Sequence, residues 1–463
     1  MTEIQAYIET ALDASSADGC IVIATESTEA NLRWAGNSLT TNGQMRTRSI
    51  SVISTFDSAA GTSVGVVTRS VSSPEELQSL VHASELAGRD AGPADDAAPL
   101  VANYPNDDAW GDDPAATSVE VFEQFAPSLG DAFRRWSGAG RLLYGFAEHQ
   151  VSSTFLGTST GVRRRFDQPS GRVEINGKAG DLSSSGYVSA HTRDFADVDV
   201  AALTGELERR LGWATRRVDL PAGRYETLMP ATTVADLMIY AYWTASARDA
   251  EEGRSVFAGR GGTGGTRIGE QLSTLPLRLY SDPAYPGLEC SPFVVATSPM
   301  GGLQSVFDNG APSPAVDWIA DGQLANLART RSWAERTGEQ PRAIVDNLVA
   351  DAGGTASIDE LVANTERGLL LTCLWYIREV DPQTLLLTGL TRDGVYLVEN
   401  GTVTGAVNNF RFNESPIDLL GRATEAGATI PTLSREWGDY FTRTAMPPLR
   451  IPDFNMSTVS EAS

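Results

Sequence analysis

The sequence predicts an α+β fold, in which an N-terminal sheet domain with helices precedes a strand-rich C-terminal domain. Two observations support this prediction. Helix and strand patterns alternate through the first half of the chain, and the end of the chain is dominated by short apolar runs separated by turn residues. The length of 463 residues corresponds to two or three domains at about 150 residues each. The hydrophobic content of 41% is enough for cores of that size.

The first elements follow from periodicity and turn chemistry. Apolar residues at helical spacing predict a helix over residues 4–12. Strand patterns follow in the runs 20–25, 32–35, 45–55 and 63–68. A turn is expected at Asn42-Gly43. Ser73, with Glu76 three residues later, has the pattern of a helix cap. These elements predict an antiparallel sheet with helices on one side.

The remainder of the N-terminal domain, assigned to residues 1–217, contains a linker and a meander. Residues 88–117 are rich in Ala, Asp, Pro and Gly, which predicts an exposed acidic linker. A helix is expected over 122–133. Short runs divided by Gly, Ser and Asn-Gly predict a β-meander over 141–191. A helix near 200–211 ends the domain.

The C-terminal domain is assigned to residues 218–463. It opens with a strand pattern over 224–230 and a helix pattern over 233–248. A serine and a glutamate three residues apart predict a capping box at 357–360. The Asn-Gly pair at 400–401 lies between apolar runs and predicts a two-residue hairpin turn.

Charge limits the partners that the chain can bind. Lys and Arg total 36 against 59 Asp and Glu, a net charge of −23. Such a surface repels phosphate backbones and anionic lipids, so neither nucleic acid nor a membrane is expected as a partner. The acidic, amphipathic N-terminus lacks the pattern of a secretory signal, and no apolar run reaches the roughly 18 residues of a membrane span. The expected location is the cytoplasm.

Cysteines and histidines limit the possible chemistry. Cys20, Cys290 and Cys373 lie far apart in apolar contexts, which predicts buried free thiols in a reducing compartment. The only histidines are His82, His149 and His191, and no two of them have the spacing of metal ligands. The C-terminal domain contains no histidine, so a zinc peptidase site is not expected there.

Hydrolysis without zinc is the alternative that the residues leave open. The acid pairs at 107–108 and 251–252 allow carboxylate chemistry, although adjacent carboxylates are usually solvated. The two G-x-S-x-G strings, at 61–65 and 157–161, lack the strand–turn–helix context of a nucleophile elbow. They are interpreted as turns.

Several segments together resemble the TldD/PmbA family of zinc-dependent peptidases, peptidase family U62. They are NLRWAGNSLTTNG and GTSVGVVT in the first domain, and ERGLLLT, VENGTVTGAV and PPLRIPDF in the second. The resemblance covers most of the chain in order. It implies a C-terminal domain of TldD/PmbA type.

Catalytic members of this family carry H-E-x-x-x-H on a helix, followed by a segment like S-V-F-x-G. This chain keeps Ser255, Val256 and Phe257 in such a segment. An ungapped register from there places Met238 and Trp243 at the zinc-ligand positions and Ile239 at the base position. Catalytic members also supply a cysteine ligand close to the C-terminus, whereas the last cysteine here is Cys373.

The resemblance therefore implies a TldE/PmbA-like subunit without the zinc motif, inactive alone. It would act in a heterodimer with a TldD-like zinc peptidase subunit that processes or degrades unfolded peptides. No metal or other cofactor is expected in this chain, and zinc is expected in the partner. Ser255, Val256 and Phe257 are the candidate substrate contacts. The alternatives are an independent hydrolase acting without zinc and a peptide-binding scaffold.

Overall fold

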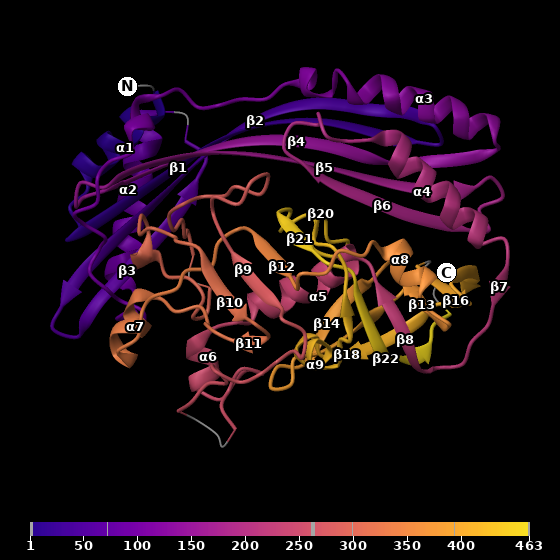
Figure 1. The fold of residues 1–463 in the computed structure, drawn as a ribbon. Helices are drawn as coiled ribbons and strands as arrows, with labels where there is room; N and C mark the ends of the chain where they lie inside the picture. The colour runs from indigo at the N-terminus through magenta and orange to yellow at the C-terminus, as the bar shows by residue number, and fades with distance from the viewer. Residues whose placement is uncertain (1–2, 72, 261–263, 299, 393, 462–463) are drawn as a thin grey trace.

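A computed structural model describes residues 3–71, 73–260, 264–298, 300–392 and 394–461. A long antiparallel sheet formed by the first half of the chain arches over the second half, as Figure 1 shows. The second half contains two further sheets. Helices and strands are both abundant, and the C-terminal half is rich in strands. The α+β prediction is therefore confirmed.

The first sheet has the strand order β3-β2-β1-β4-β5-β6, and all its neighbours are antiparallel. Its strands are β1 (Gly19–Ala35), β2 (Ser38–Ser58), β3 (Gly61–Arg69), β4 (Arg141–Thr158), β5 (Arg163–Ala179) and β6 (Ser185–Thr192). The predicted β-meander is thus three strands, of which two are long. The predicted linker, residues 88–117, begins at the end of the helix that follows β3 and ends before the helix that precedes β4.

Two local predictions in this sheet are wrong. The separate strands expected at 20–25 and 32–35 form one continuous strand, β1. The turn expected at Asn42-Gly43 lies inside β2, and the chain turns instead at Gly36 and Asn37, whose φ angles are 59° and 63°. Left-handed φ at both central residues suits a tight hairpin. The long β1–β2 ladder decides the position of the turn, because it pairs residues on both sides of Asn42-Gly43.

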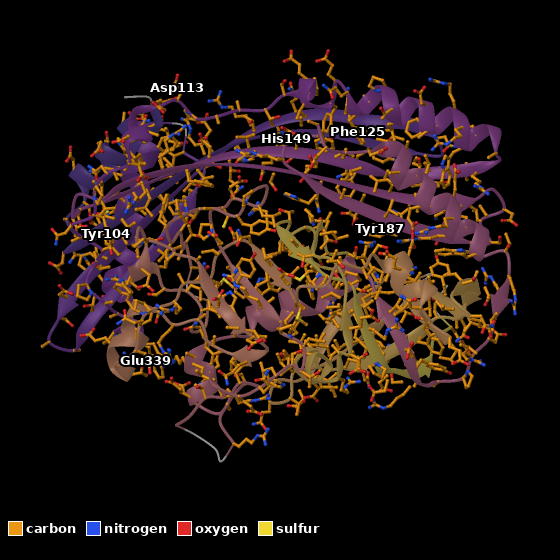
Figure 2. All side chains as sticks on the ribbon, viewed as in Figure 1. Tyr104, Asp113, Phe125, His149, Tyr187 and Glu339 are labelled. Atoms are coloured by element: carbon orange, nitrogen blue, oxygen red, sulfur yellow. The ribbon has the colours of Figure 1, made fainter. Side chains whose placement is uncertain are left out.

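Helices cover the first sheet in two groups. They are α1 (Glu3–Ala14), α2 (Pro74–Asp90), α3 (Phe125–Gly138) and α4 (Val200–Trp213), with short 3-10 turns η1 (Asp108–Gly111) and η2 (Val119–Phe122). α1 and α2 share a core with β1 and β2, whereas α3 and α4 share a core with β1, β4 and β5. Phe125 of α3 is among the buried residues of the core that α3 and α4 share with the sheet (Figure 2). The Ser73 side chain accepts from the Glu76 amide, so the predicted cap is confirmed.

The second half forms a ten-stranded and a six-stranded sheet. Its strands are β7 (Arg217–Val218), β8 (Gly223–Met229), β9 (Arg278–Ser281), β10 (Val316–Ala320), β11 (Gln323–Leu324), β12 (Leu348–Asp351), β13 (Arg367–Leu371), β14 (Trp375–Asp381), β15 (Leu386–Leu390), β16 (Val395–Glu399), β17 (Thr402–Val407), β18 (Phe410–Glu414), β19 (Glu425–Ala426), β20 (Ile430–Thr432), β21 (Thr444–Met446) and β22 (Leu449–Val459). Its helices are α5 (Ala231–Trp243), α6 (Ala247–Glu251), η3 (Val306–Asp308), α7 (Arg331–Thr337), α8 (Ile358–Ala363) and α9 (Pro416–Arg422).

Local signals in this half are confirmed with one exception. The capping box of α8 is present, and residues 400–401 turn between β16 and β17 with φ angles of 51° and 74°. The single helix expected over 233–248 is two helices, α5 and α6. The chain breaks between them, where the Ser246 side chain caps α6.

The two halves share a core. Ile21 and Leu156 of the first sheet pack with Phe293 and Phe307 of the second half. The division at 217/218 stays a prediction. The three cysteines are buried and free, as expected. Across the described ranges, no helix combines the length and apolar character needed to cross a membrane.

Candidate functional site

The helix α5 is the place where the family resemblance locates the metal motif. Ten of its residues are buried, and the stripe Val234, Leu237, Met238 and Ala241 faces the core. Met238 is 1% exposed and Ile239 is 0% exposed. A thioether is a poor zinc ligand, and an isoleucine cannot act as a base. These two side chains contribute apolar packing.

Aromatic rings occupy the other side of α5. Trp243 contacts Trp437 and Phe441 edge to face, with ring centroids 5.3 Å and 6.1 Å away. Tyr240 lies 5.6 Å from Trp437 by the same measure. Tilted and edge-to-face aromatic pairs add to the stability that burial provides. The position that the resemblance assigns to the second zinc ligand, Trp243, is therefore part of an aromatic cluster.

The contacts of Asp236 are the main polar feature of α5. Its side chain is fully buried. Oδ1 accepts hydrogen bonds from the Ser434 hydroxyl at 2.5 Å and from the Glu436 amide at 2.9 Å. The indole of Trp437 donates to the Asp236 carbonyl at 2.8 Å. Oδ2 has no hydrogen-bond partner among the described residues. The segment 433–443, close to the C-terminus, is thereby held against α5.

Burial raises the pKa of Asp236 to about 7, because a charged carboxylate loses its hydration there. The nearby Glu436 also raises this pKa, whereas the hydrogen bonds from Ser434 and from the Glu436 amide lower it. Near neutral pH the carboxyl group therefore exchanges a proton. It has no exposed surface, so a substrate cannot reach it in this conformation.

The donor atoms around α5 do not fit a zinc ion. Glu436, the neighbouring carboxylate, accepts from the backbone amides of Tyr376 and Ile377, both at 3.0 Å. Each carboxylate oxygen of Glu436 therefore already accepts a backbone hydrogen bond. Zinc sites in proteins usually combine three or four His, Cys or carboxylate ligands. No group of three or more such residues with metal-binding geometry is found in the described part of the chain.

None of the three histidines lies on α5, and two of them have structural surroundings. His149 of β4 (Figure 2) lies 2.6 Å from the Thr117 hydroxyl and 2.7 Å from the Arg193 carbonyl. Burial, with a smaller contribution from Arg443, lowers the pKa of His191 to about 4. His82 is exposed on α2. The structure does not bring these three residues together.

The three candidate substrate contacts lie in a loop after α6, and their side chains are buried. Ser255, Val256 and Phe257 are 8%, 7% and 3% exposed, and the last two belong to the same core as α5. The Ser255 hydroxyl accepts from the Phe257 amide, and the Phe257 carbonyl accepts from the Arg267 amide. In this conformation, none of these three residues therefore offers an exposed side chain to a substrate.

The residues considered for hydrolysis without zinc have structural partners. Asp107 binds the Arg164 guanidinium, and Glu251 binds Arg329. In the two G-x-S-x-G strings, Ser63 donates to the Gly88 carbonyl and the hydroxyl of Ser159 accepts from the Cys20 amide. Neither serine faces a histidine in these contacts. The string at 157–161 spans the end of β4 and the turn after it, whereas the string at 61–65 lies within β3 and is not a turn.

The segment 433–443 also contacts the first sheet. The Arg435 guanidinium lies 4.2 Å from the ring centroid of Tyr187 and 3.8 Å from that of Trp375. It is also 3.6 Å from the Glu174 carboxylate. Tyr187 on β6 points toward the second half of the chain (Figure 2). The same segment thus holds α5 on one side and the first sheet on the other.

One cavity adjoins these contacts at Tyr187, and a second lies elsewhere in the molecule. One of about 280 Å³ lies between β6, α4 and the start of α5, and Tyr187, Ser189, Arg210 and Thr232 are among its lining residues. The other, of about 180 Å³, lies between the linker and α7 and is lined by residues that include Asp95.

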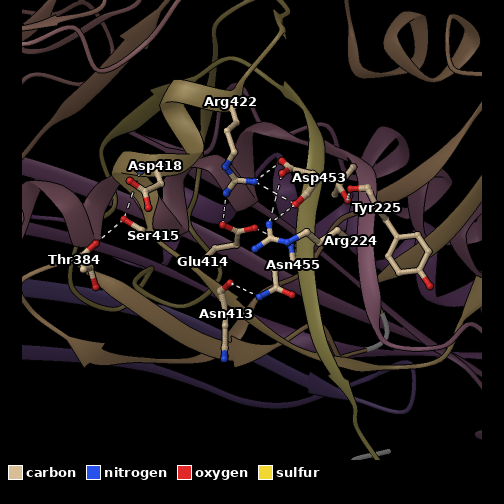
Figure 3. A network of polar contacts seen from close by, with 11 residues as sticks. Arg224, Tyr225, Thr384, Asn413, Glu414, Ser415, Asp418, Arg422, Asp453 and Asn455 are labelled. Carbon is tan, nitrogen blue, oxygen red and sulfur yellow. Dashed lines mark hydrogen bonds and ion pairs between the residues drawn. The ribbon is translucent and has the colours of Figure 1, made fainter.

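A second network of charges lies away from α5 and stabilises the C-terminal strands. The Arg422 guanidinium of α9 lies between the carboxylates of Glu414 and Asp453 (Figure 3). Glu414 also accepts from the Asn455 amide at 2.7 Å, and its side chain is 4% exposed. This network joins α9, β18 and β22.

Residues 222–458, more than half of the chain, match the family model described as the PmbA/TldA metallopeptidase C-terminal domain. The chain belongs to the PmbA/TldD family. The resemblance seen in the sequence is thereby confirmed at the level of the family. No curated protein matches the sequence.

Solved structures show that this PmbA/TldD chain shares its whole fold with others. TldE from Thermococcus kodakarensis superposes with a TM-score of 0.75 at 14% identity, covering 98% of this chain and 99% of that one. A putative modulator of a DNA gyrase from Thermotoga maritima gives 0.71 at 16% identity, with coverages of 94% and 95%. A putative modulator of DNA gyrase from Bacteroides thetaiotaomicron gives 0.72 at 13% identity, with 98% of both chains covered.

Sequence reasoning did not identify Asp236, Ser434 and Glu436 as a cluster. The signal available was a lone acid in the otherwise uncharged segment 231–243. Such an acid predicts a buried polar contact. Its partners lie about 200 residues away along the chain, and no local pattern indicates them.

Proposed function

We propose that this chain is the non-catalytic subunit of a TldD/TldE-type zinc metallopeptidase complex that processes or degrades unfolded peptides. Zinc and the catalytic residues belong to a TldD-like partner subunit. The observation that carries the proposal is the composition of α5. Two buried apolar side chains, Met238 and Ile239, and the partly buried Trp243 occupy the positions that the family resemblance assigns to the zinc ligands and the base.

The arrangement around α5 supports a subunit that keeps the contact between this helix and the C-terminal segment but lacks the zinc ligands. The helix and the C-terminal segment 433–443 are in contact, as a ligand set drawn from both would require. Here the contact consists of Asp236, Ser434 and an aromatic cluster. A neutral or singly charged carboxyl group with no imidazole beside it cannot hold zinc as the catalytic members do.

The test compares the purified chain with a reconstituted pair. The partner is a protein from the same genome that carries H-E-x-x-x-H. Metal analysis should find well under one zinc per molecule in this chain alone, and an unfolded peptide such as casein fragments should remain uncut. Mixing with the partner should produce cleavage. A matched partner variant with glutamine for the glutamate of H-E-x-x-x-H should bind this chain and stay inactive.

Three outcomes would contradict the proposal. Stoichiometric zinc in the lone chain, with cleavage that is lost on chelation, indicates a metal site in this subunit. Cleavage by the lone chain in excess chelator supports the independent hydrolase. Peptide binding without any complex or cleavage in the presence of the partner supports the scaffold.

A further inference from the structure

One part of the first sheet has an unpaired edge. β2 runs from Ser38 to Ser58, but its outer neighbour β3 pairs only with residues 50–58. Within the described residues, no strand pairs with 38–49 on the side away from β1. Nearly all side chains of 38–48 are exposed as well. The edge therefore continues for about ten residues without cover.

From residue 41 to residue 49 this edge has no proline, no bulge and, among the described residues, no covering strand, which are features that usually prevent strands from pairing. Proline, a bulge in the edge strand or a covering segment blunts most exposed edges. Residues 38–49 contain no proline, and residues 41–47 pair with β1 in regular register, whereas the register shifts at Thr40 next to the hairpin turn. Apart from Arg46 and Arg48 they are uncharged. Leu39 and Met45 are 53% and 52% exposed.

The direction of the backbone groups follows from contacts at the end of β1. The Cys20 amide donates to the Ser159 hydroxyl, and the Cys20 carbonyl accepts from the Ser159 amide. Ser159 directly follows β4, so even-numbered residues of β1 direct their backbone groups toward β4. In an antiparallel ladder the direction alternates, so odd-numbered residues of β1 bond to β2.

The pairing of β1 with β2 shows which residues of β2 direct their backbone groups toward β1. Asn31 pairs with Gly43, and Glu29 pairs with Met45, so Gly43 and Met45 bond to β1. The amide of Asp57, which bonds to the Asp18 carboxylate on the same side, agrees with this assignment. The intervening residues therefore direct their N–H and C=O groups outward. These residues are Asn42, Gln44, Arg46 and Arg48.

We infer that this edge, residues 38–48 of β2, is the surface on which an extended strand of the zinc-bearing partner subunit pairs. The inference rests on the proposed function. No undescribed run within the 463 residues exceeds three residues, which is too short to cover the edge. A second copy of this chain brings another net charge of −23, which opposes self-association. A different chain with a strand to add satisfies the outward backbone groups.

A partner of the same family strengthens this choice. The fold is kept across structures that are only 13–16% identical, so two family members can present equivalent sheet edges. Antiparallel pairing of equivalent edges relates the two subunits by an approximate two-fold axis and extends each sheet across the interface. The first sheet then becomes part of one sheet shared by both subunits.

The test uses a proline that removes one outward amide. Gln44→Pro loses an N–H that faces away from β1, so it leaves the ladder to β1 intact. Gln44→Ala is the matched control, because it changes the side chain and keeps the amide. Binding to the TldD-like partner is measured by titration. The expected result is a Kd about tenfold or more higher for Gln44→Pro, and a change under about threefold for Gln44→Ala.

A measurement on the wild-type chain covers the case in which Gln44→Pro does not fold. Residue-resolved amide exchange should show the amides of Gly43 and Met45 protected in the free chain. The amides of Asn42, Gln44 and Arg46 should exchange freely until the partner is added, and then slow by about tenfold or more. This odd–even difference is specific to strand addition.

The possible outcomes distinguish a failure of the edge-pairing inference from a failure of the proposed function. An unchanged Kd for Gln44→Pro, with unchanged exchange at the even residues, overturns the edge while the heterodimer stands. Absence of any complex with wild-type chain overturns both. Self-association that Gln44→Pro abolishes assigns the edge to a second copy and overturns the choice of partner.

Discussion

Replacing Asp236 by asparagine is expected to remove a large part of the pH dependence of stability. The carboxyl is fully buried, and burial raises its pKa from 3.8 to about 7. Asparagine keeps the acceptor oxygen that Ser434 and the Glu436 amide use. It also resembles the protonated acid in shape and charge. Comparing the two proteins therefore gives the effect of the buried charge on the free energy of unfolding.

The magnitude follows from the two pKa values. Between pH 5 and pH 7 the folded protein holds a proton on Asp236 that the unfolded chain has released. Stability is therefore greater at pH 5 and decreases as the pH rises through this window. Each unit corresponds to about 1.4 kcal/mol, and the folded group is half ionised at pH 7, so it accounts for about 2 kcal/mol between pH 5 and pH 7 and about 3 kcal/mol by pH 8. No screening by solvent reduces this value, because the group has no exposed surface.

The assay is urea unfolding at pH 5, 6, 7 and 8 for the wild-type chain and Asp236→Asn. The difference in unfolding free energy between the two proteins cancels the contributions of titrating groups that do not interact with Asp236. The variant should gain about 3 kcal/mol relative to wild type on going from pH 5 to pH 8. Asp13→Asn, on the exposed side of α1, is the control and should show no such gain. If the difference for Asp236→Asn does not change with pH, the carboxylate is not held in a low-dielectric site and the reasoning is refuted.

Three further predictions concern stability. Glu414→Ala leaves Arg422 and a backbone amide without their buried partner, and urea unfolding should show a loss of about 3 kcal/mol, compared with under about 0.5 kcal/mol for an exposed glutamate. Trp437→Ala removes the ring through which the segment 433–443 contacts α5 and should cost about 3–5 kcal/mol in the same assay. Trp437→Phe should recover most of this loss, and equal losses would contradict the packing argument. The lowered pKa of His191, about 4, means that stability falls as the pH decreases from about 6.5 toward 4. His191→Gln should flatten that part of the thermal unfolding profile, and an unchanged profile would show that the imidazole is solvated.

Elements with strong local signals could be predicted from the sequence. The Ser73 cap, the capping box of α8 and the hairpin at 400–401 depend on residues within a few positions of one another. Backbone geometry and side-chain hydrogen bonds within one turn decide such features. The helix α5 could also be predicted, because its apolar residues recur every three or four positions.

Where distant strands compete with local signals, the sequence was misleading. Asn42-Gly43 has turn chemistry, yet the pairing of β1 with β2 extends beyond it on both sides. The many bonds of that ladder outweigh the preference of two residues. The turn moved to Gly36-Asn37, which also accepts left-handed φ. The unpaired edge of β2 is a direct result of this placement.

The α+β class, the family and the lack of histidine in residues 218–463 could be predicted from the sequence, because they depend on composition, period and ordered motifs. Three features could not: the contact of Asp236 with Ser434 across 198 positions, the burial of the Ser255–Phe257 side chains, and the open edge at residues 38–48. These features arise from contacts between residues far apart in the chain. Such contacts depend on how whole sheets pack, and no local pattern records them.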